Sequence, residues 1–348
     1  MKTPIKLLAF LFLVTFSFSC NKSNEEVEEE IQTELETNVY AVVSEYDGTN
    51  FTINVWKNDV VTPLSLSNAT SVRSSSIYVS GTDVYVGGSE YNGSKHIAKI
   101  WKNGTSTSLS DGSISTFINS IFVAGSDVYA AGKEQNGSAI IWKNGIATSL
   151  SDHVSNVFSI FVNESDVYAV GYEEINDKQM ATLWKNGVAT AFDEAEKFIS
   201  FNAVYVSNNT VYIAGEEYIP GLSIEPDLNF ATIWVDGIKT RLDCNYLPTP
   251  TSIFVLDDDI YVTGSEYIQG SEKTKARLWK NGEGTDLTDG LNRAQGQSVF
   301  ASGTDVYVGG YASNGTKNVA VIWKNGVPTT LTDGANNASV NSVFVTTN

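Results

Sequence analysis

The sequence has too few cysteines to be held together by disulfide bonds. Only Cys20 and Cys244 occur in 348 residues. We expect Cys20 to be used at the N-terminus, as argued below, which leaves one thiol and no internal bridge. Stability must therefore come from packing. Histidine is equally scarce, and neither His96 nor His153 has the spacing to further ligands that a metal site needs.

Basic residues are also in short supply. The chain has 22 Lys and Arg against 40 Asp and Glu, a formal charge of −18. Because binding to phosphates needs clustered Lys and Arg, a nucleic-acid partner is excluded. There is no Walker loop, no G-x-S-x-G elbow and no Cys-x-x-Cys, so the common catalytic motifs are missing. Charged residues make up only 18%, and polarity without charge is typical of extracellular, turn-rich β proteins.

One hydrophobic run stands out, at the N-terminus. Lys2 and Lys6 precede an apolar stretch over residues 7–18, followed by Ser19 and Cys20. The run is too short to span a bilayer and reads as a secretory signal. Ending on a small residue and Cys, it resembles a bacterial lipoprotein signal with the looser consensus of Bacteroidota. The resemblance implies a signal peptide over 1–19 and acyl chains on Cys20. The alternative is an ordinary signal peptide in which the Cys falls by chance.

The next segment, 20–37, is acidic and lacks aromatic residues. Seven of the seventeen residues in "NKSNEEVEEEIQTELET" are Glu, so the segment cannot bury enough apolar area to fold alone. We interpret it as a solvated tether. It also resembles the surface-export signal of Bacteroidota lipoproteins, which implies an outer-membrane protein that faces the cell exterior and touches the membrane only through its lipid.

From residue 38 onward the chain is repetitive. All seven tryptophans fall 41 to 50 residues apart, mostly in the tetrapeptide Trp-Lys-Asn-Gly, at Trp56, Trp101, Trp142, Trp184, Trp234, Trp279 and Trp323. Each has a Tyr upstream, at Tyr40, Tyr85, Tyr129, Tyr168, Tyr212, Tyr261 and Tyr307. Three residues after that Tyr comes Gly in six repeats and Val43 in the first. A residue present in every repeat is expected to be structural, so we interpret the Trp as a wedge between repeats.

Each repeat predicts four short strands. In the third repeat these are "SIFVAG", "DVYAAGKE", "SAIIWKNG" and "IATSLSD", and Asn-Gly is a strong signal for a hairpin turn. Four antiparallel strands repeated seven times predict an all-β, seven-bladed β-propeller over residues 38–348. A β-solenoid is the rival architecture. The WKNG frame resembles the extracellular propeller repeats of bacterial secreted proteins, including the HAF type and Kelch-like repeats, which implies a fold and no particular activity.

The two ends of the repeat region complement each other. The repeat region begins with the second strand of a repeat, "NVYAVVSEY", and ends with the first strand of a repeat, "SVNSVFVTTN". We therefore predict that residues 342–345 pair with residues 39–45 and close the ring, which removes the open sheet edges.

Carboxylates and tyrosines recur where the second strand of each repeat ends. Five residues after the repeat Tyr stands a glutamate in six repeats and Ala312 in the seventh; the glutamates are Glu45, Glu90, Glu134, Glu173, Glu217 and Glu266. The following residue is a tyrosine in four repeats, Tyr46, Tyr91, Tyr218 and Tyr267. A second acidic series comes ten residues after the Trp, at Asp111, Asp152, Glu194, Asp289 and Asp333.

We expect these side chains to share one face with the variable loops between second and third strands, where binding usually resides. The Glu and Tyr residues would then form a ring around the axis that suits a sugar, a basic protein patch or a calcium ion. The alternative is that they are solvated strand ends next to turns. No other cofactor is indicated.

The sequence favours a binding module over an enzyme. We predict a non-enzymatic, monomeric surface lipoprotein that binds a glycan or a protein partner through this acidic, Tyr-bearing face. The alternative is a carbohydrate-active enzyme, a glycosidase or lyase, on the same scaffold, because paired carboxylates are plentiful.

Overall fold

A computed structural model describes residues 36–66, 71–135, 137–192, 197–221 and 228–347. The expected signal peptide, Cys20 and nearly all of the tether lie outside the described residues. So do Glu194 of the second acidic series and part of the long loop of the fifth repeat. The described part of the chain contains no helix long and apolar enough to cross a membrane.

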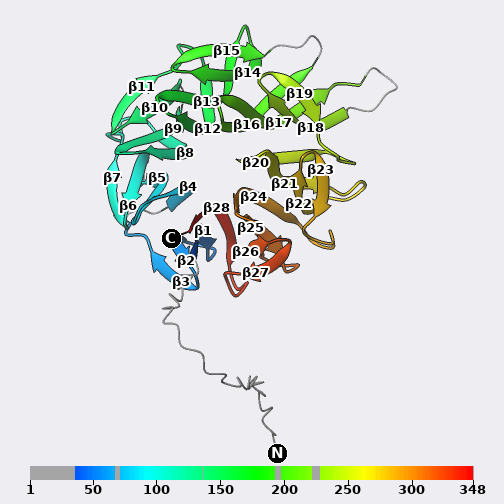
Figure 1. Ribbon diagram of the computed structural model, residues 1–348. Helices are drawn as coiled ribbons and strands as arrows, with labels where there is room; N and C mark the ends of the chain where they lie inside the picture. Colours follow the sequence, from blue (N-terminus) through cyan, green and yellow to red (C-terminus); the bar gives the residue numbers. More distant parts are fainter. Residues whose placement is uncertain (1–35, 67–70, 136, 193–196, 222–227, 348) are drawn as a thin grey trace, which may run out of the picture. The chain divides into compact units, whose positions relative to one another are not determined.

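The described residues form seven four-stranded antiparallel sheets arranged as blades around an axis (Figure 1). The prediction of a seven-bladed propeller is confirmed. The first strand of each blade lies next to the axis and the fourth lies outermost. The described strands follow one another with no helical element between them, as the repeat pattern predicted.

Each blade has the same strand order from the axis outward. Blade 1 contains β28 (Asn337–Thr347), β1 (Thr37–Tyr46), β2 (Phe51–Lys57) and β3 (Val60–Pro63). Blades 2 to 4 are β4 (Ser71–Ser80), β5 (Asp83–Tyr91), β6 (His96–Lys102), β7 (Thr105–Ser108); β8 (Thr116–Ala124), β9 (Asp127–Glu134), β10 (Ala139–Lys143), β11 (Ile146–Ser149); and β12 (Ser155–Asn163), β13 (Asp166–Ile175), β14 (Lys178–Lys185), β15 (Val188–Phe192). Blades 5 to 7 are β16 (Phe198–Ser207), β17 (Thr210–Ile219), β18 (Leu228–Val235), β19 (Ile238–Arg241); β20 (Pro248–Leu256), β21 (Asp259–Tyr267), β22 (Thr274–Lys280), β23 (Glu283–Asp286); and β24 (Ala294–Ser302), β25 (Asp305–Ser313), β26 (Asn318–Lys324), β27 (Val327–Thr330).

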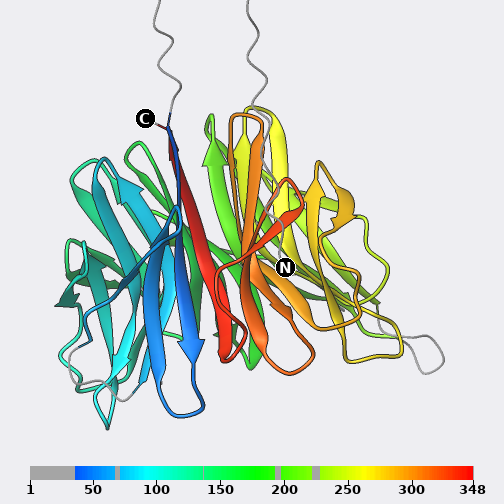
Figure 2. The same cartoon turned by 90° about the horizontal axis from the view of Figure 1, so that it is seen from below.

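This strand order gives the propeller two distinct faces. The face that we call the loop face carries the loops between second and third strands and the connections from one blade to the next. The opposite face, the turn face, carries the tight turns. The chain enters β1 and leaves β28 on the turn face, where the two strands lie side by side (Figure 2).

Every residue of the Trp-Lys-Asn-Gly motif has a structural role. In blade 2, Trp101 is fully buried, and Lys102 pairs with Asp83 at 2.7 Å and lies 5.2 Å over the ring of Tyr85. Asn103 and Gly104 adopt positive φ angles of 49° and 81°, as a type I′ hairpin turn requires. The Asn103 side chain also accepts a hydrogen bond from the N–H of Val84. The motif therefore fastens the third strand to the second at the turn face.

The tryptophans fill the spaces between blades, as predicted. Trp101 packs with Tyr40, Val42 and Ile53 of blade 1, and Trp142 packs with Tyr85 of blade 2. Six of the seven are at most 2% exposed; Trp56 is the partly exposed member. Burying a large aromatic side chain stabilises the native state by roughly 2–3 kcal/mol. The wedges therefore hold each blade against the one before it.

The glycine of the repeat permits a β-bulge in the innermost strand. In blade 3 the pairing of β8 with β9 shifts between Ile118 and Ser120, which leaves Asn119 as the extra residue. A Cβ atom on Gly132 would collide with the carbonyl oxygen of Phe117. Bulges of this kind recur in the first strand of all seven blades. The bulged strand bends and turns side chains toward the axis.

The bulged residues connect neighbouring blades around the axis. Their side chains donate hydrogen bonds to carbonyl oxygens of the next blade, at 2.7–2.9 Å, in the pairs Ser75–Ile118, Asn119–Val157, Asn202–Pro250, Thr251–Gly296 and Asn341–Ser74. These bonds satisfy carbonyl groups that the bulge leaves without a ladder partner. They fix the angle between blades from the inside.

Seven aromatic residues of the first strands form a closed ring near the turn face. Neighbouring ring centroids are 4.4–4.9 Å apart in the order Tyr78, Phe122, Phe161, Tyr205, Phe254, Phe300, Phe344 and back to Tyr78. Six of the seven interplanar angles are 51–55°, close to one seventh of a turn, about 51°. The ring planes therefore run parallel to the axis, and the seven aromatic residues encircle it near the turn face.

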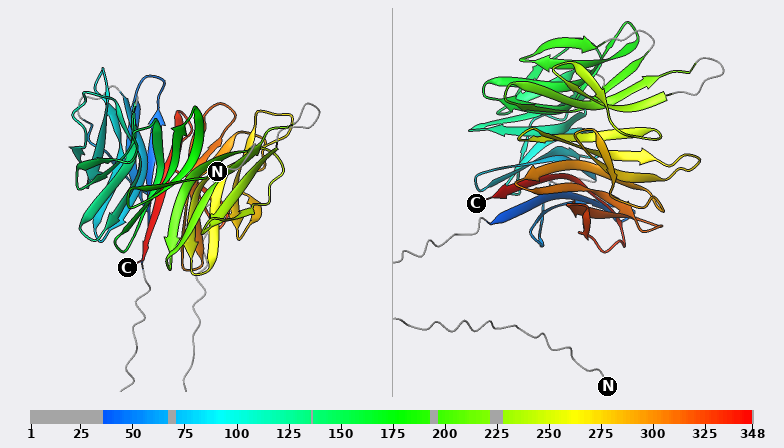
Figure 3. Two further views of the ribbon diagram at one scale, coloured as in Figure 1. Left: turned by 90° about the horizontal axis from the view of Figure 1, so that it is seen from above. Right: turned by 45° about the vertical axis from the view of Figure 1, so that its right-hand side comes forward.

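The ring of blades closes between the first and last strands. β28 pairs with β1 from Thr37–Thr347 to Tyr46–Asn337, including Val39–Val345 and Val42–Ser342. This pairing confirms the predicted contact between residues 342–345 and 39–45. The views in Figure 3 show β28 continuing the innermost layer of the propeller.

Candidate functional site

The repeated glutamates lie between blades rather than around the axis. They stand near the loop-face end of the second strand, on the side of the sheet that packs against the preceding blade. Glu90, Glu217 and Glu266 are at most 3% exposed. Lys99 and Arg277, the partners of Glu90 and Glu266, come from third strands, and Glu217 is held from the fourth strand and by Lys197, which directly precedes β16. Glu90, Glu217 and Glu266 are therefore paired with cations within the structure, whereas the expected arrangement had their carboxylates converging around the axis.

Glu217 is held by three cations. Lys197 and Lys239 approach Oε1 at 3.1 and 2.7 Å, and Arg241 contacts Oε2 at 2.7 Å. Burial alone would raise the pKa of Glu217, but the hydrogen bonds from Lys239, Arg241 and Lys197 outweigh it and lower the pKa to about 2. The carboxylate stays ionised and occupied within the described structure.

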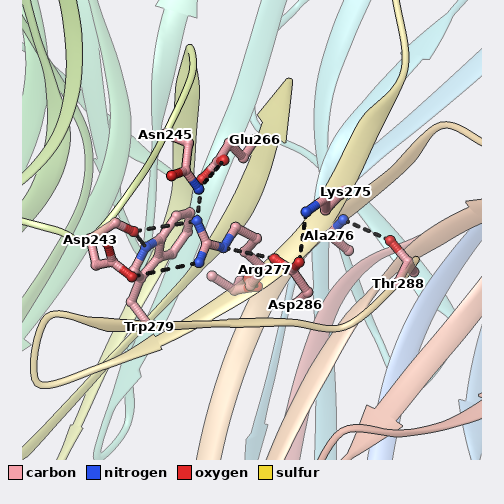
Figure 4. Close-up of polar contacts among 10 residues, drawn as sticks. Asp243, Asn245, Glu266, Lys275, Ala276, Arg277, Trp279, Asp286 and Thr288 are labelled. Carbon is pink, nitrogen blue, oxygen red and sulfur yellow. Dashed lines mark hydrogen bonds and ion pairs between the residues drawn. The ribbon is translucent and has the colours of Figure 1, made fainter. Parts of the chain in front are cut away.

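Blades 2 and 6 show the same carboxylate with a cation two residues before the Trp. In blade 2 the ammonium group of Lys99 lies 2.5 Å from Glu90, and both side chains are buried. In blade 6 Arg277 pairs with Glu266 (Figure 4). The guanidinium also contacts Asp286 at 3.1 Å and lies 5.5 Å from the ring of Trp279. A buried carboxylate is thus neutralised locally in both blades.

The remaining glutamates have other surroundings. Glu173 is 6% exposed, Glu134 and Glu45 are partly exposed, and Glu45 accepts a hydrogen bond from Asn336 at 2.9 Å. In blade 7 the pair is apolar, since Ala312 and Val321 occupy the positions of glutamate and cation. Among the described residues no group of three or more His, Cys, Asp or Glu could hold a metal ion.

The tyrosines that follow these glutamates lie at the loop face, partly exposed. Tyr46 stacks on Phe51 with ring centroids 4.4 Å apart, Tyr91 lies 5.0 Å from the ring of His96, and Tyr218 lies 5.9 Å from Phe198. Tyr267 is partly exposed as well. Each stands in its own blade, so the structure does not gather the four into one cluster.

One hollow on the loop face combines an aromatic pair with neutral polar groups. We call it the blade-1 hollow; its volume is about 350 Å³, and its lining includes Tyr46, Phe51, Tyr311, Gln297, Asn318, Asn337, Asn341 and Glu45. A second hollow of about 280 Å³ adjoins it across Ser44, Phe51 and Asn341 and extends to Arg73, Phe117 and Asn119. Glu45 and Tyr46 were predicted as site residues. The others were missed.

The missed residues left two signals in the sequence. Gln297 and Asn341 occupy the bulge position, which carries Ser, Asn, Thr or Gln in six repeats and Phe158 in one. The polar character recurs at this one position of the first strand in six repeats. The second signal is a pair of asparagines at strand starts. Asn318 begins β26 and Asn337 begins β28, and Asn337 accepts a hydrogen bond from the N–H of Asn318 at 3.0 Å.

The groups that could do chemistry are scattered. Burial lowers the pKa of His96 and raises that of the Cys244 thiol, so neither is an activated base or nucleophile. Burial also raises the pKa of Glu216, opposed by hydrogen bonds from Asn229 and Asn202. Asp111, Asp289 and Asp333 accept hydrogen bonds from backbone N–H groups two residues later, as turn residues do.

Comparison with known proteins supports the fold alone. No family model matches the chain, and no curated protein matches its sequence. Among solved structures, the β-propeller domain of the Trilobed protease from Pyrococcus furiosus superposes with a TM-score of 0.52 and 13% identity, over 82% of this chain and 87% of that domain. It is described as having an open velcro topology, whereas in this chain β28 and β1 close the ring. Semaphorin 1a of Drosophila, extracellular domains 1–2, gives a TM-score of 0.48 at 7% identity over 72% of this chain and 75% of its own.

Proposed function

We propose that this protein is a non-enzymatic binding module that takes a neutral glycan in the blade-1 hollow. One observation carries the proposal: the hollow joins the stacked, exposed pair Tyr46 and Phe51 to the amides of Gln297, Asn318 and Asn341. Sugars present apolar C–H faces, which pack on aromatic rings, and hydroxyl groups, which bond to amides. Phe51 is 39% exposed, which leaves its ring accessible to such a face.

The lining favours binding over hydrolysis. Glycosidases flank the scissile bond with two carboxyl groups about 5–10 Å apart. The described lining of the blade-1 hollow includes one, Glu45. The carboxylates Glu217 and Glu266 of other blades are engaged by cations of their own blades. An enzyme on this scaffold remains the alternative, and release of sugar from a bound polysaccharide would establish it.

We further propose that the propeller is displayed on the outer surface of a cell by acyl chains on Cys20. The chain enters the propeller at Thr37 on the turn face, so a tether from Cys20 attaches on the side away from the blade-1 hollow. The loop face is then free of the attachment. This arrangement suits a module that captures extracellular ligands.

Binding to polysaccharides tests the glycan proposal. Immobilised neutral polysaccharides should retain the full chain, and Phe51→Ala should weaken retention about tenfold, since aromatic stacking contributes about 1 kcal/mol or more. Phe198→Ala is the matched control, because Phe198 is also exposed and also lies beside a repeat tyrosine, in blade 5. Equal effects of both changes, or no retention by any neutral polysaccharide, would contradict the proposal.

Membrane fractionation tests the anchor. Cys20→Ala should move the protein from the membrane fraction to the soluble fraction, because a single residue carries the acyl chains. Cys244→Ala is the control and should leave fractionation unchanged. Membrane association of Cys20→Ala equal to that of the unmodified sequence would refute the lipid anchor.

A further inference from the structure

A crevice opens between the last and first blades, on the outer side of the ring closure. We call it the closure crevice; it has a volume of about 320 Å³ and is lined by Val43, Glu45, Asn54, Trp56, Val61, Leu331, Thr332 and Asp333. It combines two carboxylates with a tryptophan ring. Its volume lies in the range of ligand pockets.

Two of the other repeats show how a cation can fill the equivalent space. Glu45 corresponds to Glu90 and Glu266, and Asn54 corresponds to Lys99 and Arg277, each two residues before its Trp. In blade 2 the pocket beside the Trp holds the ammonium group of Lys99, and in blade 6 it holds the guanidinium of Arg277. Both cations are bonded to the glutamate and come from the same blade.

Blade 1 keeps the carboxylate and the tryptophan without the cation. Asn54 is too short and lacks the charge to replace Lys99 or Arg277. Trp56 is also partly exposed, whereas the other six repeat tryptophans are at most 2% exposed, including those of blades that carry Ile, Thr or Val at this position. Asp333, exposed on the connection from blade 7, adds a second carboxylate to the same crevice.

We propose that the closure crevice is a socket for an arginine side chain of a partner protein. The guanidinium would take the place that Arg277 fills in blade 6, bonded to Glu45 and Asp333 and packed against Trp56. Planar guanidinium groups bond to carboxylates in a fork geometry and stack on aromatic faces, which a lysine ammonium does less well. The charge of −18 on the chain would also speed the approach of a basic partner at low salt. This site is separate from the proposed glycan site, although Glu45 borders both.

Titration with N-acetyl-arginine amide tests the socket directly. Added to the full chain, the probe should change tryptophan fluorescence, because Trp56 is the accessible repeat tryptophan, and the change should vanish in Trp56→Phe. N-acetyl-citrulline amide has nearly the same shape without the charge and should bind at least tenfold more weakly. Asp333→Asn should weaken the arginine probe several-fold, and so should added salt. Asp289→Asn, at the equivalent place between blades 6 and 7, should have no effect.

A self-filling variant provides a second, independent test. Asn54→Arg should place a guanidinium in the crevice from within, as in blade 6, and so abolish probe binding and raise the melting temperature by several degrees. The gain in melting temperature should disappear when Glu45→Gln is added. Phe51→Ala, which alters the glycan site alone, should leave probe binding intact.

Three results would overturn the proposal. If the citrulline probe binds as tightly as the arginine probe, the guanidinium charge does not contribute to binding. Undiminished probe binding in Asp333→Asn would place the site elsewhere, and so would undiminished binding in Asn54→Arg. Should Asn54→Arg fail to fold, the citrulline and Asp333→Asn comparisons decide alone.

Discussion

At the scale of single residues, one repeated glutamate has several different environments. Its position could be predicted from the sequence, because the spacing to the repeat tyrosine is constant. Its partners were missed, since they come from different places: the neighbouring strand for Glu90 and Glu266, and the fourth strand and a connection for Glu217. The signal was present: Lys99 and Arg277 accompany a glutamate, whereas Val321 accompanies Ala312. The signal is incomplete, because Ile140, Thr182 and Thr232 occupy the same position in the other repeats that have a glutamate beyond the first.

Glu217 should make stability depend on acid pH. Its pKa is lowered to about 2, so the folded state favours the ionised form, and this stabilisation is present above pH 4.5 and is lost as the pH falls toward 2. Glu217→Gln should therefore cost about 2–3 kcal/mol at pH 7, because three partly exposed cations lose the buried carboxylate that they share. Urea unfolding at pH 7 and at pH 3 should show the difference from the original sequence shrinking in acid. Glu134→Gln, at a partly exposed member of the series, should cost far less; an equal cost would contradict this account.

Tyr205 should make stability depend on alkaline pH. Burial, with Tyr78 as a smaller contributor, raises the pKa of Tyr205 to about 12. The unfolded chain ionises this phenol near pH 10, so its stabilising contribution is full below pH 10 and is lost as the pH rises toward 12. Tyr205→Phe fits a ring that already contains five phenylalanines. Unfolding measured at pH 9 and pH 11 should show a smaller loss in Tyr205→Phe, and an unchanged loss would refute the assignment.

At the scale of elements, the four strands per blade could be predicted but the bulges could not. Apolar runs and Asn-Gly turns report burial and hairpins, which are local properties. A bulge depends on how two strands pair, and its mark in the sequence is indirect: a polar residue such as Asn119 in the first strand, opposite a glycine such as Gly132 in the second. The first repeat has Val43 in the glycine position, and there the bulge is formed with β28 from the far end of the chain.

Gly132→Ala tests the close approach at the bulge. The new methyl group would meet the carbonyl oxygen of Phe117, and relief requires the innermost strand to move, at a cost of about 2–3 kcal/mol. Gly137→Ala in the same blade is the control, because its nearest neighbour would be a side-chain oxygen of Glu134 at 3.5 Å, an ordinary contact. Chemical denaturation should separate the two variants. Equal stability would mean that the strand yields without cost.

At the scale of the whole molecule, the sequence predicts the number of blades and the closure because both follow from counting incomplete repeats. It does not predict what the closure leaves behind. The blade-1 hollow is lined by residues of β28 and β1, and the closure crevice lies between blades 7 and 1, so both depend on residues from the two ends of the repeat region. Breaking the repeat at the seam thus creates the two candidate sites, while the six intact blades serve as a scaffold.

Removing the last strand should therefore affect stability and the blade-1 hollow together. Deletion of residues 339–348 removes the buried Val340, Val343 and Val345 and exposes the edge of β1. Each buried valine contributes roughly 1.5–3 kcal/mol, so the loss should reach several kcal/mol and lower the melting temperature markedly. A synthetic peptide of residues 337–348 should restore much of the melting temperature by adding a strand to that edge. A scrambled peptide should not. An unchanged melting temperature after the deletion would show that closure by β28 does not hold the ring together.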